Sequence, residues 1–230
     1  MITTVGFDAD DTLWQNERAF RDTQARFAEL LAPHADPGHL SERLLAAERR
    51  NLGRYGYGVK GFVLSMIETA LEVTDRRVDG AVIDDLLAMG RDMLAHPTEL
   101  LPGAAETVAA LKGRVRLILV TKGDLLDQER KLAQSGLGDS FDAVEIVSDK
   151  TAPVYDRIFA RHGDGAARAM MVGNSVRSDV LPAIEAGAWG VWVPHDLTWE
   201  IERAEVPSGT DRFARIGHLA EVPTLLDNIL

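Results

Sequence analysis

Residues 2–13 read Ile-Thr-Thr-Val-Gly-Phe-Asp-Ala-Asp-Asp-Thr-Leu, and this stretch decides the fold. Its first half, residues 2–7, is short, apolar and rich in β-branched side chains, which predicts a buried strand. The run stops at Asp8, and Asp10, Asp11 and Thr12 follow. Because ligands bind beyond the carboxyl ends of the strands in open parallel sheets, we expect these carboxylates at a functional edge.

The remainder of the chain separates into two regions with different periodicities. Residues 14–97 are helical in pattern, most clearly over 60–73 and 82–94. After Pro97, helix and strand alternate, with strands predicted at 115–120, 144–147, 169–172 and 191–193. Such alternation is typical of a parallel sheet with helices on both faces. We therefore predict an α/β fold with a Rossmann-like parallel-sheet core at 1–14 and 99–230, and an inserted all-helical segment at 15–98.

Composition limits the classes of function. The 230 residues carry a net charge of −11, which argues against a nucleic-acid partner because phosphate backbones are held by clustered Lys and Arg. No apolar stretch reaches the roughly 18 residues of a membrane span, and residues 1–8 show no export signal. The chain has no cysteine, which excludes disulfides and thiolate metal sites. We expect a cytoplasmic protein without a membrane or nucleic-acid partner.

Polar residues follow each of the first four predicted strands, and together they suggest a reaction. They are Asp8, Asp10, Asp11 and Thr12; Thr121, Lys122, Gly123 and Asp124; Ser148, Asp149 and Lys150; and Gly173, Asn174 and Ser175, with Asp179 close behind. Each group alone is explained by helix capping or a turn. Jointly, the carboxylates would repel one another at one sheet edge without a cation. Oxygen ligands without His or Cys favour Mg²⁺, and a metal, a lysine and a hydroxyl around a nucleophile suit phosphoryl transfer.

The same residues resemble the haloacid dehalogenase superfamily. Residues 7–13 are similar to its first motif, DxDxT, and the other motifs follow in order along the whole chain: Thr121 ends a hydrophobic strand, Lys150 precedes a helix, and Gly173-Asn174 comes before Asp179. The helical insertion between the first two motifs matches a cap. Four elements in order, in the expected strand context, form a specific pattern.

The resemblance implies a role for each matching residue. Asp8 would be the nucleophile that forms an aspartyl-phosphate, and Asp10 the general acid and then the base. Thr121 and Lys150 would bind phosphoryl oxygens. Mg²⁺ would be held by Asp8, the Asp10 carbonyl and Asp179, with Asn174 beside it. Many family members carry Asp where this chain has Asn174, which lowers the charge around the metal.

A second candidate cluster lies in the cap. Arg54, Tyr55, Tyr57 and Lys60 belong to the most basic and aromatic segment of the chain, and closely spaced glycines interrupt it. We interpret them, together with Lys122, as substrate-binding candidates. The alternative is an exposed helix connection with solvated charges.

Three rival functions remain beside a Mg²⁺-dependent phosphatase for a small phosphate monoester, such as a nucleoside monophosphate or a sugar phosphate. A haloacid dehalogenase needs the first aspartate but neither a metal nor an acid two residues on, so Asp10 favours the phosphatase. A phosphomutase would differ in shielding the intermediate from water. A binding module that has lost catalysis would have no need of the complete set of motif residues. The sequence does not specify the substrate or the oligomeric state.

Overall fold

The computed structural model describes residues 1–229 and divides them into two compact units. The first, called the core, comprises Met1–Glu17, Thr98–Lys122 and Gln128–Leu230. The second, called the cap, comprises Arg18–Pro97 and Gly123–Asp127. These bounds differ from the sequence-based ones chiefly in the short segment 123–127, which the sequence assigns to the core. Its Asp124 accepts a hydrogen bond from Lys60 of the cap at 2.9 Å.

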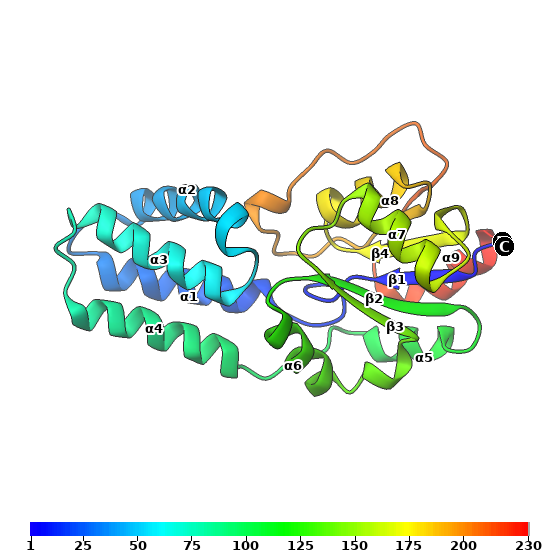
Figure 1. Cartoon of the computed structure of the whole chain (residues 1–230), viewed down its shortest axis with the longest axis horizontal. Coiled ribbons are helices and arrows are strands. Elements are labelled where there is room, and N and C mark those ends of the chain that lie inside the picture. Colours follow the sequence, from blue (N-terminus) through cyan, green and yellow to red (C-terminus); the bar gives the residue numbers. More distant parts are fainter. Residues whose placement is uncertain (230) are drawn as a thin grey trace. The chain divides into compact units, whose positions relative to one another are not determined.

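Among the described residues, the core contains one sheet of six strands in the order β3-β2-β1-β4-β5-β6 (Figure 1). All neighbouring strands are parallel, so the α/β fold class is confirmed. The strands are β1 (Thr4–Phe7), β2 (Arg116–Lys122), β3 (Ala143–Val147), β4 (Ala169–Gly173), β5 (Trp189–Trp192) and β6 (Phe213–Arg215). The order runs outward from β1 in both directions, and such a switch point is where open α/β sheets bind ligands.

Side chains alternate along the strands and are buried on both faces of the sheet. Val5 and Phe7 of β1 pack in one hydrophobic cluster with helices α5 (Ala104–Leu111) and α9 (Val222–Ile229). Ile118 and Val120 of β2 pack in another with α7 (Ala152–His162) and α8 (Leu181–Glu185). This burial on both faces explains why the strands form continuous apolar runs in the sequence.

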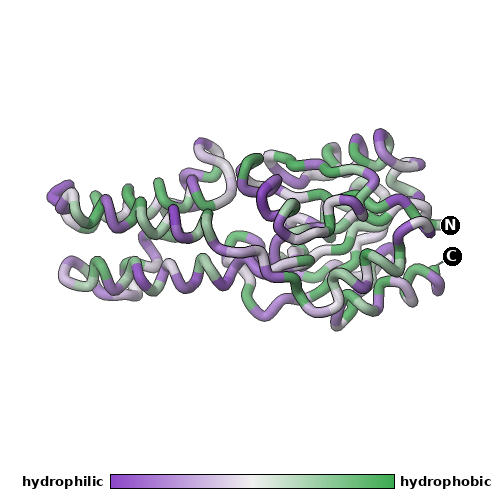
Figure 2. Tube along the Cα trace, turned by 90° about the horizontal axis from the view of Figure 1, so that it is seen from below, coloured by the Kyte–Doolittle hydropathy of each residue, from purple (hydrophilic) through white to green (hydrophobic). Residues whose placement is uncertain are grey.

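Four helices form the cap and share a hydrophobic cluster of their own. They are α1 (Glu17–Leu31), α2 (Pro37–Tyr55), α3 (Val59–Val73) and α4 (Gly80–Ala95). Hydrophobic and hydrophilic residues alternate along them at helical spacing (Figure 2). Helices α3 and α4 approach closely at Gly90, where an added Cβ would lie 2.5 Å from Val63 Cγ2. The helical pattern of residues 14–97 therefore corresponds to an antiparallel set of amphipathic helices with its own core.

Shorter elements complete the described chain. Helix α6 spans Leu125–Ser135, and a π-helical turn spans Val176–Val180. The 3₁₀ turns are Gly138–Ser140, Ala166–Arg168, Glu200–Glu202 and Leu219–Glu221. The π turn is followed directly by α8, and the strands and helices expected from the sequence did not include β6 or α9. No helix within residues 1–229 is both long and apolar enough to cross a membrane.

Candidate active site

The segment that leaves β1 is shaped by Asp11. Its backbone lies in the left-handed region with φ of 59°, where Asp is more readily tolerated than most residues. Its N–H donates to the Trp14 carbonyl at 2.7 Å, and its carboxylate accepts the backbone N–H groups of Asn16 and Glu17 at 2.9 and 3.0 Å. Asp11 thus organises this turn and caps the start of α1.

Asp8, Lys150 and Asp179 meet at the carboxyl edge of the sheet. The Lys150 ammonium donates to Asp8 Oδ1 at 2.5 Å and to Asp179 Oδ1 at 2.7 Å. All three residues are buried, although they follow β1, β3 and β4 respectively in the chain. The lysine therefore lies between two carboxylates in a site largely shielded from solvent.

Thr12 connects Asp8 to the loop after β4. Its hydroxyl donates to Asp8 Oδ2 at 2.8 Å and accepts the backbone N–H of Asn174 at 3.0 Å. The Asn174 side-chain oxygen is 3.4 Å from the same hydroxyl. Asn174 therefore lies beside the nucleophile candidate, and both Asp8 oxygens have defined donors.

Burial and like charge dominate the electrostatics of this group. Burial, followed by the neighbouring Asp179, raises the pKa of Asp8 above its ordinary value, and Lys150 only partly offsets both effects. Burial alone would lower the pKa of Lys150, but Asp179 and Asp8 together raise it above its ordinary value. Two carboxylates with one ammonium leave a net negative charge in a desolvated site, which is costly without a further cation.

The donor chemistry fits a small hard cation. Within residues 1–229, no group of three or more His, Cys, Asp or Glu side chains is arranged to hold a metal ion. The pair of Asp8 and Asp179 nevertheless offers carboxylate oxygens, and Asn174 adds an amide oxygen nearby, a set that suits Mg²⁺. The uncompensated negative charge of this pair is the observation that favours a cation.

Gly173 makes room for the Asp179 carboxylate. An added Cβ at Gly173 would lie 2.2 Å from Asp179 Oδ2, a distance no real contact reaches. The same oxygen accepts the Ser175 N–H at 2.9 Å. Glycine at position 173 of the motif therefore has a steric reason. Any larger residue there would collide with the Asp179 carboxylate, which lies against the end of β4.

Asp10 is bound to a different set of partners. Its Oδ1 accepts hydrogen bonds from Trp14 Nε1 at 2.8 Å and Lys131 Nζ at 2.9 Å, and its Oδ2 accepts one from Gln128 Nε2 at 2.8 Å. Gln128 and Lys131 are three residues apart in α6 and so share a face of that helix. The sequence analysis did not single out either residue, although a spacing of three positions is typical of side chains on one helix face.

Thr121 and Lys122 occupy the end of β2. Thr121 is buried and lies opposite Ile146 of β3. The Lys122 ammonium donates to Glu202 Oε1 at 2.5 Å and to Ser178 Oγ at 2.7 Å. The sequence suggested substrate binding for Lys122 and offered no signal for Glu202, which lies in the short 3₁₀ turn Glu200–Glu202.

The cap candidates lie around the connection between α2 and α3. Arg54 and Tyr55 form the end of α2, Tyr57 is in the connection, and Lys60 is in the first turn of α3. The Tyr55 hydroxyl donates to Glu68 Oε1 at 3.1 Å. Lys60 forms the ion pair with Asp124 described above, and its side chain is 55% exposed. These contacts give Tyr55 and Lys60 structural partners within the cap.

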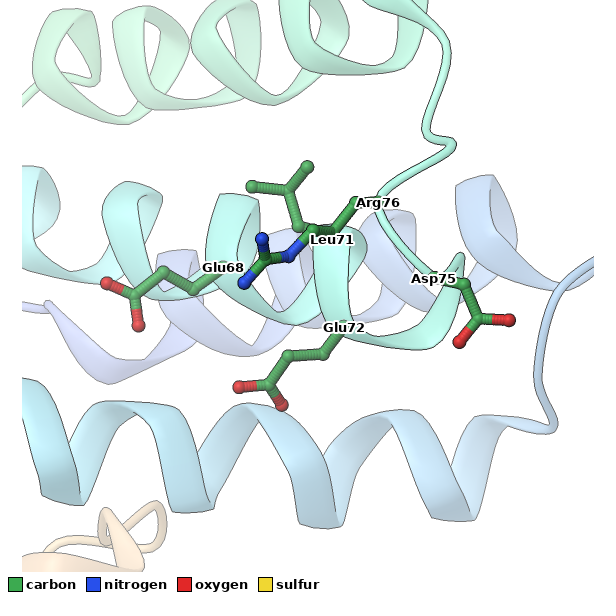
Figure 3. A pocket seen from close by; sticks show the side chains of 5 residues that line it. All are labelled: Glu68, Leu71, Glu72, Asp75 and Arg76. Atoms are coloured by element: carbon green, nitrogen blue, oxygen red, sulfur yellow. The ribbon is translucent and has the colours of Figure 1, made fainter.

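A hollow of about 690 Å³ also lies in the cap (Figure 3). Its lining comes from α3 and the turn after it: Glu68, Leu71, Glu72, Asp75 and Arg76. Glu68 and Glu72 also pair with Arg50. Three carboxylates against one guanidinium in the lining disfavour an anionic phosphate ester, so we do not assign the substrate to this hollow.

Comparisons with known proteins show which chains this one is similar to. A family model described as haloacid dehalogenase-like hydrolase matches residues 2–187. A solved haloacid dehalogenase-like family hydrolase from Xanthomonas campestris is 39% identical, with a TM-score of 0.89 over 99% of this chain and 91% of that one.

Two curated relatives carry names of activities. Glyceraldehyde 3-phosphate phosphatase of Methanothermobacter thermautotrophicus is 27% identical over 220 residues, covering 90% of this chain and 91% of the relative. Pyrimidine 5′-nucleotidase YjjG of Escherichia coli K12 is 28% identical over 132 residues. That match spans only about half of either protein, 55% of this chain and 56% of the relative.

Proposed function

Because the chain belongs to the haloacid dehalogenase-like hydrolase family, we propose that it hydrolyses a small phosphate monoester through a phosphoryl group carried on Asp8, with Mg²⁺ as cofactor. The observation that carries the proposal is the buried Asp8–Lys150–Asp179 group, with a further carboxylate, Asp10, two residues after Asp8. Buried paired charges at a sheet switch point are characteristic of functional sites. The names of the two curated relatives support a nucleoside monophosphate or a sugar phosphate as the substrate class.

The proposed reaction has two displacements at phosphorus. In the first, an Asp8 oxygen forms a bond to phosphorus, the bond to the ester oxygen breaks, and Asp10 donates a proton to that oxygen. In the second, water attacks the phosphorus, Asp10 takes a proton from the water, and phosphate leaves Asp8. Lys150 neutralises charge on the phosphoryl oxygens, and the Thr121 hydroxyl donates to them.

Asp8, Asp179, Asn174 and the Asp10 carbonyl are the proposed holders of Mg²⁺. When bound, the ion would neutralise phosphoryl charge and orient the ester for in-line attack. The proposal is supported by the excess negative charge of the Asp8–Asp179 pair and by the absence of any cysteine from the sequence.

A direct assay separates this proposal from its rivals. The purified chain is offered nucleoside monophosphates, sugar phosphates and 2-chloropropionate, with Mg²⁺ or with EDTA, and released phosphate and chloride are measured. We expect phosphate release that depends on Mg²⁺. Chloride release without phosphate release would establish a dehalogenase instead, and an isomerised sugar phosphate would indicate a mutase. Turnover of none of these compounds would support the binding module.

The ranking of the metal ligands is testable through Asp179 and Asn174. Because hard-cation binding follows ligand charge, we expect Asp179→Ala to raise the Mg²⁺ concentration for half-maximal activity by about 100-fold or more, and Asn174→Ala to raise it less. Asn174→Asp should lower it, since it restores a carboxylate. Activity titrated against Mg²⁺ measures all three. Equal losses in the two alanine variants would show that the amide is an essential ligand.

The cap candidates are tested by substrate preference. If Arg54 and Tyr57 bind the substrate's leaving group, Arg54→Ala and Tyr57→Ala should lower kcat/KM for the best ester of the screen by about 10-fold or more. The loss on p-nitrophenyl phosphate should be smaller, because that ester has a small generic leaving group. Arg49→Ala, an exposed change on α2, is the matched control. The same comparison applies to Tyr55 and Lys60. Equal losses on both substrates, or none, would make the segment a plain connection.

A further inference from the structure

Glu202 lies at the centre of a buried polar group that the reaction described above does not use. Its side chain is 12% exposed and its partner Lys122 is 13% exposed. Glu202 Oε1 accepts from the Lys122 ammonium, and Oε2 accepts from the hydroxyls of Ser175 and Ser178, both at 2.6 Å. A nearly buried carboxylate with three short donor contacts is a costly arrangement that needs all of its partners.

The two serines belong to the turn that presents Asp179. Ser175 Oγ accepts the Ser178 N–H at 3.0 Å, and the Ser175 carbonyl accepts the Asp179 N–H at 2.9 Å. The Ser175 N–H in turn donates to the Asp179 carboxylate. The Ser175 hydroxyl accepts from the Ser178 N–H, and the Ser178 hydroxyl accepts from Lys122. Each hydroxyl donates its only proton to Glu202, so the carboxylate fixes the orientation of both hydroxyls.

We propose that Glu202 is a positioning residue, which holds the Ser175–Asp179 turn so that the Asp179 carboxylate stays fixed for Mg²⁺, with Lys122 as its counter-ion. This inference rests on the proposed metal-binding role of Asp179. It assigns Lys122 to the turn rather than to the substrate. Residues that support a metal ligand commonly affect metal affinity nearly as much as the ligands themselves.

A second hydrogen bond joins the segment that carries Glu202 to the same Ser175–Asp179 turn. The Arg177 guanidinium, within the same turn, donates to the Ile201 carbonyl at 2.6 Å. Burial by itself would raise the pKa of Glu202, but Lys122 and the two serine hydroxyls together lower it below its ordinary value. The carboxylate therefore stays charged at neutral pH and can accept from all three donors.

The test measures Mg²⁺ binding without substrate. Isothermal titration calorimetry is run on the wild type, Glu202→Gln and Ser178→Ala, with circular dichroism and Tm to establish folding. An amide at 202 must direct its NH₂ either at Lys122, which loses that contact, or at the two hydroxyls, which loses both of theirs as they stand. We expect Glu202→Gln to raise the Mg²⁺ Kd by about 10- to 100-fold and Ser178→Ala to raise it less. Glu200→Gln is the matched control, because Glu200 lies on the same 3₁₀ turn and pairs with the exposed Arg203; its Kd should equal that of the wild type.

The outcomes separate this inference from the proposed function. Wild-type affinity for Mg²⁺ in a folded Glu202→Gln protein would show that Glu202 only anchors its own segment. If Glu202→Gln does not fold, wild-type affinity in Ser178→Ala would overturn the inference in the same way. A wild type that binds no Mg²⁺ would overturn the metal role of Asp179, and the inference with it.

Discussion

Replacing Asp8 by asparagine is expected to reduce turnover of the best phosphate ester by on the order of a thousandfold or more, because the covalent route is lost. Asparagine has nearly the same shape as aspartate, and its amide oxygen can still accept from Lys150 or Thr12. Lys150 also keeps its contact with Asp179 at 2.7 Å. The folded structure should therefore persist while the nucleophile is absent.

The measurement is phosphate release under saturating Mg²⁺, with circular dichroism and Tm to establish folding. Asp156→Asn, an exposed change on α7 of the core, is the control and should retain full activity. Mass spectrometry must exclude deamidation of the new asparagine. A pure, folded Asp8→Asn protein with appreciable turnover would overturn the assignment of Asp8 as nucleophile.

Asp10→Asn is expected to reduce turnover by about a hundred- to ten-thousandfold, the usual range for a lost general acid. In the structure, both Asp10 oxygens already accept hydrogen bonds, from Trp14, Lys131 and Gln128. Proton transfer to a leaving oxygen therefore requires the Asp10 side chain to exchange at least one of these partners.

A series of esters with leaving groups of increasing basicity distinguishes catalysis from structure. If Asp10 protonates the leaving oxygen, the loss in Asp10→Asn should be largest for alkyl phosphates and smallest for p-nitrophenyl phosphate, whose leaving group needs little protonation. Lys131→Gln is the comparison, since it removes one partner of Asp10 and leaves the acid in place. A uniform loss across the series would mean that Asp10 serves only to hold Lys131 and α6.

The sequence predicted the α/β class because each core element carries its own local signal. The strands are buried on both faces, so they stand out as short apolar runs, and the cap helices show helical periodicity. The last strand, β6, and the final helix, α9, were missed: β6 is only three residues long and partly buried, so its apolar signal is weak. The grouping of 123–127 with the cap was also missed, because contacts between distant residues, such as Lys60 and Asp124, 64 positions apart, have no local signature.

For the candidate site, the sequence by itself determined which residues follow which strands, because strand ends and the motif spacing are properties of the chain. That was sufficient to single out Asp8, Lys150 and Asp179. Only the tertiary structure decided that Lys150 lies between the two carboxylates, that Asp10 contacts Lys131 and Gln128 of α6, and that Glu202 contacts the turn before Asp179. Those contacts join residues from 27 to 142 positions apart. They depend on the order and register of the strands and on side-chain orientation, which no short stretch of sequence specifies.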